Sequence, residues 1–117
     1  MLFVYHPKCT TCQKAEKWLS EHSFCCEKRD IRENRPSLEE LREWWKMSGL
    51  PLQKWFNTSG LKYRELGLKD KLPSMTEEEK LRLLASDGML VKRPIFVTNS
   101  GVLVGFRETE WTEALQQ

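Results

Sequence analysis

The sequence predicts an α/β fold in which helices cover a mixed sheet of four short strands. Two apolar runs near the N-terminus are separated by a helical pattern, which favours two parallel strands joined by a crossover helix. Two apolar runs near the C-terminus are separated by a tight turn, which favours an antiparallel hairpin. A long helical stretch lies between these two pairs. We therefore expect a single domain over residues 1–117, with a helical insertion at about residues 35–90 between the second and third strands.

The composition of the chain argues against several classes of protein. The 19 basic and 17 acidic residues leave a formal charge of +2, so the chain lacks the basic excess typical of a nucleic-acid-binding tract. No apolar run approaches the roughly 20 residues of a membrane span. The run Leu2–Tyr5 is also much shorter than the apolar core of a signal peptide, roughly 7 to 15 residues. We expect a cytoplasmic protein with no membrane segment and no direct contact with nucleic acid.

The first expected strand, Leu2–Tyr5, ends at His6 and Pro7 and leads directly into a Cys-x-x-Cys pair, Cys9 and Cys12. In the cytoplasm such a pair indicates redox or metal chemistry more often than a structural disulfide, because cellular reductants keep most thiols reduced. Two thiols at this spacing can close a small disulfide ring. The first of them lies at the start of a helix, where the free N–H groups favour a thiolate.

The helix expected after the pair assigns different roles to the two thiols. Its inward-facing residues recur at spacings of three and four, and they are Cys12, Ala15, Trp18 and Leu19. Cys12 therefore shares the buried face, whereas Cys9 lies one turn earlier, at the exposed end of the helix. This pattern predicts an attacking thiol at Cys9 and a sheltered, resolving thiol at Cys12.

Residues 24–31 predict the second strand, with Cys25 and Cys26 on opposite faces. Adjacent cysteines on a strand cannot readily pair with each other or share a metal ion. We interpret both as small residues in or beside the core, with a redox role as the alternative. His6 precedes the Cys-x-x-Cys pair and supplies a third zinc-ligand type, but a closed zinc site needs a fourth ligand. The sequence therefore predicts no metal site.

Two capping boxes, Ser37 with Glu40 and Thr76 with Glu79, start the main helices of the insertion. The second of these helices ends at Asp87 and Gly88. Shorter elements lie between them, namely a helix, a turn and a further helical turn at residues 52–56, 57–60 and 63–66. The Trp and Leu residues of this region recur at helical spacing, and we interpret them as core residues rather than a cofactor site.

The last third of the chain predicts two strands, residues 95–98 and 102–105, joined by Asn99-Ser100-Gly101. A final helix follows from Glu108 to Leu115, with Trp111 on its buried side. The chain is therefore expected to end with a hairpin that is packed against a helix.

These features together resemble the arsenate reductase (ArsC) and Spx family over essentially the whole chain. The Cys-x-x-Cys after the first strand carries part of the resemblance. The other segments are Phe56-Asn57-Thr58-Ser59-Gly60, Tyr63-Arg64-Glu65-Leu66, Asp87-Gly88-Met89-Leu90, Lys92-Arg93-Pro94-Ile95 and Gly105-Phe106-Arg107. The resemblance implies a thioredoxin- or glutaredoxin-like fold with a helical insertion. It also implies that Pro94 is a cis-proline beside the active cysteine.

In the arsenate reductases of this family that use glutathione and glutaredoxin, a cysteine attacks the oxyanion and three arginines bind it. The resemblance assigns the nucleophile to Cys9 and two of the arginines to Arg93 and Arg107. The third position falls on Asn57, which is a departure from the family pattern. A neutral amide binds an anion less strongly than a guanidinium does, so this departure weakens the arsenate hypothesis.

Cys12 is a second departure, because the glutathione-dependent reductases that the chain resembles generally lack this thiol. Its presence permits direct closure of a disulfide between Cys9 and Cys12. The Spx-type members have this arrangement, and there it is a redox switch on a regulator that binds the C-terminal domain of the α subunit of RNA polymerase. Thr10 and Thr11, between the two cysteines, are expected to join the anion-binding residues.

Two functions therefore follow from the sequence. The first is a thiol oxidoreductase that acts on arsenate, a disulfide or a glutathione adduct. It would have no bound cofactor and would use glutathione, glutaredoxin or thioredoxin as electron donor. The alternative is a Spx-like regulator that binds RNA polymerase. The segment at residues 56–60 and the lack of a basic tail after the last helix favour the oxidoreductase.

Overall fold

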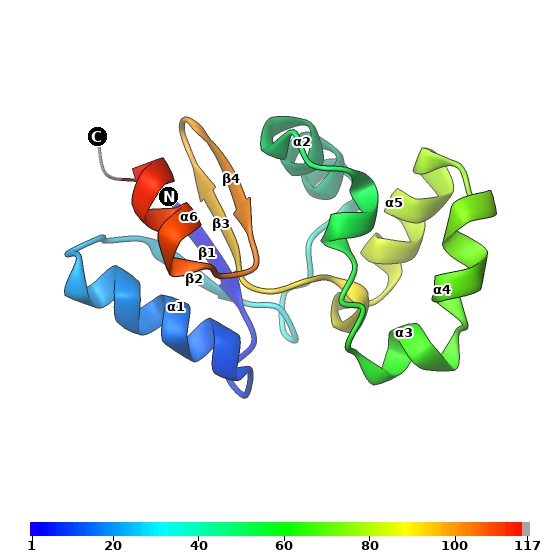
Figure 1. Ribbon diagram of the computed structural model, residues 1–117, viewed down its shortest axis with the longest axis horizontal. Coiled ribbons are helices and arrows are strands. Elements are labelled where there is room, and N and C mark those ends of the chain that lie inside the picture. Colours follow the sequence, from blue (N-terminus) through cyan, green and yellow to red (C-terminus); the bar gives the residue numbers. More distant parts are fainter. Residues whose placement is uncertain (116–117) are drawn as a thin grey trace.

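A mixed four-stranded sheet, in the order β2-β1-β3-β4, forms one half of the computed structural model, which describes residues 1–115 (Figure 1). The strands are β1 (Leu2–Tyr5), β2 (Glu27–Asp30), β3 (Ile95–Thr98) and β4 (Gly101–Val104). β1 pairs with β2 in parallel and with β3 in antiparallel orientation, and β3 forms the predicted hairpin with β4. The predicted mixed α/β sheet is confirmed, and the fold is thioredoxin-like.

Helices lie on both sides of this sheet. The helices are α1 (Thr10–Glu21), α2 (Leu38–Ser48), α3 (Leu61–Glu65), α4 (Leu68–Lys71), α5 (Glu77–Ser86) and α6 (Glu108–Leu115). Short 3₁₀ turns occur at Leu52–Trp55, Leu72–Ser74 and Gly88–Leu90. α1 and α6 lie together on one side of the sheet, and the insertion extends from α2 to α5 on the other (Figure 1). Within residues 1–115, no helix is both long and apolar enough to cross a membrane.

Both predicted capping boxes are present. The Ser37 side chain accepts a hydrogen bond from the Glu40 N–H at 3.1 Å, and the Thr76 side chain accepts one from the Glu79 N–H at 3.1 Å. α4 was not predicted, because it is a single turn without a capping side chain. Its N-cap residue is Gly67, whose φ of +63° is in the left-handed region.

The prediction for the start of β2 was wrong. β2 begins at Glu27, because β1 offers no partner beyond Leu2, which pairs with Glu27. Cys25 and Cys26 therefore precede the strand rather than alternating along it. Cys26 is half-buried beside the aromatic cluster on one side of the sheet, whereas Cys25 is exposed. The expected place in or beside the core holds for Cys26 and is wrong for Cys25.

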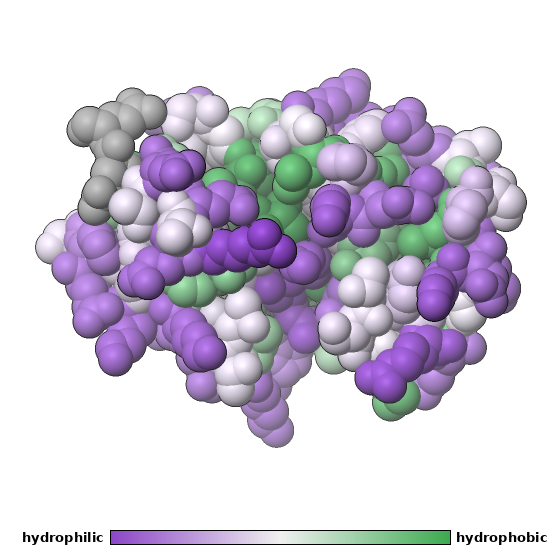
Figure 2. All heavy atoms as spheres, viewed as in Figure 1, coloured by the Kyte–Doolittle hydropathy of each residue, from purple (hydrophilic) through white to green (hydrophobic). Residues whose placement is uncertain are grey.

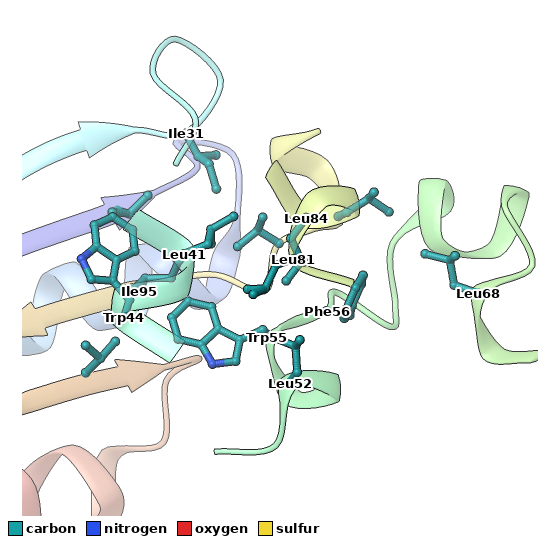
Figure 3. Close-up of a cluster of buried hydrophobic side chains, with 14 of the residues drawn as sticks. Ile31, Leu41, Trp44, Leu52, Trp55, Phe56, Leu68, Leu81, Leu84 and Ile95 are labelled. Atoms are coloured by element: carbon teal, nitrogen blue, oxygen red, sulfur yellow. The ribbon is translucent and has the colours of Figure 1, made fainter. Parts of the chain in front are cut away.

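The two central strands bury both of their faces. Phe3 and Phe96 point toward α1 and α6, where they pack with Trp111. Val4 and Ile95, their neighbours along β1 and β3, point to the opposite face and pack with the insertion. Figure 3 shows Ile95 among the buried side chains of this cluster. This is the alternation that a strand between two layers requires. The sheet is therefore held by two separate apolar clusters, one on each side.

A short antiparallel bridge ties the insertion to the segment that enters β3. Phe56 pairs with Val91, the Asn57 N–H donates to the Leu90 carbonyl at 2.8 Å, and the Lys92 N–H donates to the Trp55 carbonyl at 2.8 Å. These contacts place Phe56 and Asn57, which follow the first 3₁₀ turn, directly beside Val91 and Leu90, and they place Trp55 beside Lys92.

Ser48, the last residue of α2, joins that helix to the following 3₁₀ turn. Its hydroxyl donates to the Trp45 carbonyl at 2.7 Å and accepts hydrogen bonds from the Leu50 N–H at 3.2 Å and the Trp55 indole N–H at 3.3 Å. The Trp55 side chain is completely buried. Because a buried N–H is costly without a partner, Ser48 fixes the position of Trp55 and of the bridge beside it.

The substitution Ser48→Ala should lower the free energy of unfolding by about 1–3 kcal/mol, because it leaves the buried Trp55 indole N–H without an acceptor. Ser86→Ala is the matched control. Ser86 also ends a helix and donates to a carbonyl three residues earlier, that of Leu83 at 2.6 Å, but within residues 1–115 no N–H depends on it. Urea denaturation should show less than about 0.5 kcal/mol of loss for the control. Equal losses in the two variants would contradict the role assigned to Ser48.

Candidate active site

Cys9 occupies the N-cap position of α1. Its backbone is extended, with φ −84° and ψ 119°, and its carbonyl accepts the first helical hydrogen bond, from the Gln13 N–H at 3.0 Å. Its own N–H donates to the His6 carbonyl at 3.1 Å, which closes the turn between β1 and the helix. The side chain at this position lies against the free N–H groups of the first helical turn. Cys9 is half-buried and so remains accessible to a reactant.

The environment of Cys9 favours the thiolate. Burial raises the pKa of this thiol, but the backbone N–H and thiol of Cys12 and the guanidinium of Arg93 lower it further than burial raises it. The net pKa lies below that of an ordinary cysteine. Cys9 is therefore the stronger nucleophile of the pair at neutral pH.

Cys12 lies on the buried face of α1, as its spacing predicts, and is 1% exposed. Burial raises the pKa of the Cys12 thiol to about 12, and the adjacent Cys9 sulfur contributes to this rise. The His6 N–H partly offsets the rise, because it donates to Cys12 Sγ at 3.5 Å. Cys12 is thus a protonated thiol that can donate to the Cys9 thiolate. Both cysteines are free thiols in this structure.

His6, the third zinc-ligand type near the pair, belongs to the turn before α1. Its Nδ1 accepts a hydrogen bond from the Lys8 N–H at 3.1 Å. Burial and the charge of Arg93 lower the pKa of His6, so the ring is neutral at pH 7. Among residues 1–115 there is no group of three or more His, Cys, Asp or Glu side chains placed to hold a metal ion.

An open cleft of about 550 Å³ adjoins Cys9, between the sheet and the insertion. The predicted site residues that line it are Cys9, Thr11, Asn57, Arg93 and Arg107. Thr10 is exposed outside this lining, and Cys12 is buried behind Cys9. The structure thus brings together residues from three distant parts of the chain. On the face shown in Figure 2, both hydrophobic and hydrophilic side chains lie along the boundary between the sheet and the insertion.

Arg93 lies directly before Pro94, and the peptide bond between them is cis, as the resemblance implied. The Pro94 carbonyl accepts a hydrogen bond from the Gly105 N–H at 2.8 Å, which joins this segment to the end of β4. Arg93 Nη1 donates to Met89 Sδ at 3.8 Å. Its Nε is buried and has no hydrogen-bond partner among the described residues. The guanidinium therefore retains donors for an anion or for the Cys9 thiolate.

Arg107 is positioned by Gly105 and Trp111. Gly105 has a φ of +73°, which turns the chain from β4 toward α6. Its carbonyl accepts a hydrogen bond from the buried Trp111 indole at 3.0 Å, and the Arg107 carbonyl accepts the Trp111 N–H at 3.0 Å. The side chain of Arg107 reaches the cleft from this turn. The sequence predicted that Trp111 is buried, but not that its indole holds this loop.

The cleft also contains residues that the sequence did not point to, chiefly Lys54, Lys92 and Glu110. Lys92 is the first residue of the Lys92-Arg93-Pro94-Ile95 segment that carried part of the resemblance, but the resemblance assigned it no role. Lys54 lies in the 3₁₀ turn and reaches the cleft through the bridge between Phe56 and Val91. Neither lysine belongs to a motif with a known charge requirement, and only the fold brings them together.

Comparison with known proteins agrees with the resemblance. The ArsC family model matches residues 5–114. The chain is 53% identical to the uncharacterised protein YusI of Bacillus subtilis, over 97% of this chain and 96% of that protein. It is 29% identical to the global transcriptional regulator Spx of Listeria innocua, over 89% of this chain and 78% of Spx.

Solved structures give the same result. A protein from Bacteroides fragilis that is described as ArsC family related is 54% identical, with a TM-score of 0.93 over 96% of this chain and 94% of that chain. A protein from Streptococcus mutans that is described as a possible arsenate reductase is 45% identical, with a TM-score of 0.84 over 91% of this chain and 90% of that chain.

The variant Arg93→Gln should raise the pKa of Cys9, because it removes a positive charge from beside the thiolate. The thiolate fraction at pH 7 then falls, and alkylation by iodoacetamide slows. In the wild type, the pH profile of alkylation should have its midpoint below the free cysteine value of about 8.5. Mass spectrometry of the Cys9 peptide separates this thiol from the other three.

Arg82→Gln is the matched control for this measurement, because Arg82 lies on α5 and pairs with Glu78 at 3.1 Å, away from the cleft. This variant loses the same charge and should keep the wild-type midpoint. A wild-type midpoint at the free cysteine value would show that Cys9 is not activated.

Proposed function

Because the chain belongs to the ArsC family, we propose that it is a thiol oxidoreductase in which Cys9 is the nucleophile and Cys12 the resolving thiol. One observation carries the proposal. An accessible thiol with a lowered pKa lies at the mouth of a cationic cleft, in contact with a buried thiol whose pKa is raised to about 12. This asymmetry is what a two-thiol exchange reaction requires.

With a disulfide as substrate, the Cys9 thiolate attacks one of its two sulfur atoms. The substrate S–S bond breaks, one half leaves as a thiolate that takes a proton from water, and the other half stays bound to Cys9. Arg93 stabilises the Cys9 thiolate before the attack, and the free N–H groups of α1 do the same. The product of this step is a mixed disulfide at Cys9.

Cys12 then resolves the mixed disulfide. Formation of the adduct removes the negative charge of Cys9, which is one of the causes that raise the pKa of Cys12. Cys12 therefore loses its proton more easily in the adduct than in the free protein. Its sulfur attacks Cys9, the remaining half of the substrate leaves as a thiol, and a Cys9–Cys12 disulfide forms. Two protein thiols are oxidised and one substrate disulfide is reduced, so the electrons balance.

An external thiol must return the pair to its reduced state. Glutathione, glutaredoxin or thioredoxin would do this by the same exchange in reverse. No bound cofactor is needed, since sulfur carries both electrons throughout. With arsenate as substrate, Cys9 would bond to arsenic and displace water. The attack of Cys12 would then release trivalent arsenic together with the electron pair of the As–S bond.

A Spx-like regulator is the second candidate. The similarity to Spx of Listeria innocua supports it, as does the Cys-x-x-Cys pair, which could act as a switch between dithiol and disulfide forms. Retention of the protein on the C-terminal domain of the α subunit of RNA polymerase tests this alternative. Retention in one redox state and release in the other would favour the regulator. Turnover of a disulfide without such retention would favour the enzyme.

The variant Cys12→Ser should trap the mixed disulfide, because no second thiol remains to resolve it. Incubation with a small disulfide should add one substrate half to Cys9, visible as a stable mass increase, and turnover should stop. Cys9→Ser should neither form the adduct nor turn over. Cys25→Ser removes an exposed thiol outside the cleft and should leave both steps unchanged. An adduct that clears as fast in Cys12→Ser as in the wild type would refute the resolving role.

The variant Asn57→Arg should strengthen the binding of arsenate or phosphate. A guanidinium at this edge of the cleft adds charge-assisted hydrogen bonds worth about 1.5–3 kcal/mol, which corresponds to roughly 10- to 150-fold in affinity. Protection of Cys9 from iodoacetamide by added arsenate measures the effect. Asn57→Gln, which lengthens the side chain without adding charge, should leave the protection unchanged. No gain with arginine would show that position 57 does not contribute to anion binding.

A further inference from the structure

The cations of the cleft greatly outnumber its carboxylates. Among the described residues, the lining contains Lys54, Lys92, Arg93 and Arg107 but a single acidic residue, Glu110. The whole chain, by contrast, is nearly balanced, with 19 basic and 17 acidic residues. The ion pairs that form among residues 1–115 use cations elsewhere on the surface, and none involves these four side chains. The excess positive charge is therefore local to the cleft and is available to a ligand.

Lys92 lines the cleft between the backbone of Trp55 and that of Gly105. Its N–H is fixed to the Trp55 carbonyl at 2.8 Å. Its side chain runs past Gly105, where a methyl group would lie 2.9 Å from Lys92 Cε. The absence of a side chain at Gly105 leaves the space that the lysine stem occupies. This arrangement holds the lysine stem against the end of β4, within the lining of the cleft.

A second hollow of about 370 Å³ continues beyond the two lysines, since Lys54 and Lys92 line both spaces. Its other walls include Lys69 and the aromatic rings of Phe56 and Tyr63. None of the described residues that line it is acidic. The linings of the two adjoining hollows, which we call the groove, together contain five cationic side chains and one carboxylate, as well as apolar surface on which a chain of atoms can pack.

The size of this groove does not match a small oxyanion. A tetrahedral ion has five heavy atoms, and the contacts of Arg93 and Arg107 beside Cys9 would suffice for it. The first hollow alone, at about 550 Å³, lies in the range of sites for organic ligands, about 300–1,000 Å³. Lys69 and the aromatic rings lie on the far side of Lys54 and Lys92 and have no evident role for an ion that sits at Cys9.

We propose that the groove binds an acidic peptide whose disulfide is the substrate of Cys9. The sulfur lies at Cys9, and carboxylates along the peptide lie against Lys92, Lys54 and Lys69 in turn. This inference rests on the proposed thiol-exchange function and names its substrate class. The exchange is the one described above, in which one half of the peptide disulfide leaves as a thiol and the other half is released by Cys12.

The first test compares an anionic disulfide, dithiobis(nitrobenzoate), with the neutral dithiodipyridine. Both report thiol exchange by absorbance, and a Cys25→Ser, Cys26→Ser background removes the other accessible thiols. In the double variant Lys54→Gln, Lys92→Gln, the rate with the anionic reagent should fall roughly fivefold or more. The rate with the neutral reagent should change by less than about twofold, which also shows that the variant is folded.

Lys46→Gln with Lys62→Gln is the matched control, because both lysines are exposed on the insertion and neither lines the groove. This pair removes the same net charge and should change both rates by less than about twofold. An equal fall in the control would mean that overall charge, and not the groove, attracts the reagent, and it would overturn the proposal.

The second test uses disulfide-linked peptides that differ only in carrying two Glu, two Gln or two Lys beside the cysteine. The value of kcat/KM should follow the order Glu, Gln, Lys, and the spread should collapse in the Lys54→Gln, Lys92→Gln variant. No preference among the peptides, together with strong protection of Cys9 by arsenate in both proteins, would overturn the acidic-peptide assignment. Failure of the wild type to react with even the neutral disulfide would instead refute the thiol-exchange function itself.

Discussion

The contact on which the site depends is the short bridge between the insertion and the entrance to β3. Phe56 pairs with Val91, and a backbone hydrogen bond flanks the pair on each side. The insertion otherwise packs on the sheet largely through side chains, and such packing does not by itself fix a register. The bridge does fix it, because each hydrogen bond has one donor and one acceptor. Asn57 and Lys54 are in this way held beside the segment that leads into Arg93, and all three residues line the cleft.

Backbone contacts also position the other side of the cleft. A single indole N–H, that of Trp111, holds the carbonyl of Gly105, and the Gly105 N–H holds the carbonyl of Pro94. α6, the end of β4 and the cis-proline segment are therefore linked in series. Cys9 lies at the N-terminus of α1, beside these linked segments. Helix geometry there separates the accessible thiol of Cys9 from the buried thiol of Cys12 within a single turn. The Cys9 sulfur is thus positioned by the end of a helix, and the cationic side chains around it are positioned by loops that backbone hydrogen bonds fix.

Most of the fold was predictable because its signals are local. A capping box such as Ser37 with Glu40 needs four residues, and the phase of Cys12 on α1 needs two turns. The start of β2 was missed because a strand ends where its partner ends, which no local pattern reveals. The residues of the candidate site also fall into those with a local sequence signal and those without one. The thiols could be identified from their spacing, whereas Lys54 and Lys92 converge only through pairing between segments that are far apart in the sequence. Charges scattered among 36 ionised residues, 19 basic and 17 acidic, give no indication of which will share a cleft.

The placement of Arg93 beside Cys9 has a consequence for the equilibrium between the dithiol and the disulfide, apart from its effect on rates. A charge that stabilises the thiolate stabilises the reduced protein, whereas the neutral disulfide gains nothing from it. In the proposed function, the guanidinium that lowers the pKa of Cys9 therefore also raises the reduction potential of the Cys9–Cys12 couple. A couple of this kind is readily reduced by a thiol donor. In the reduced form, its nucleophilic sulfur is already a thiolate. In the proposed cycle, activation of the Cys9 thiol and its return to the reduced state are thus two effects of the Arg93 charge.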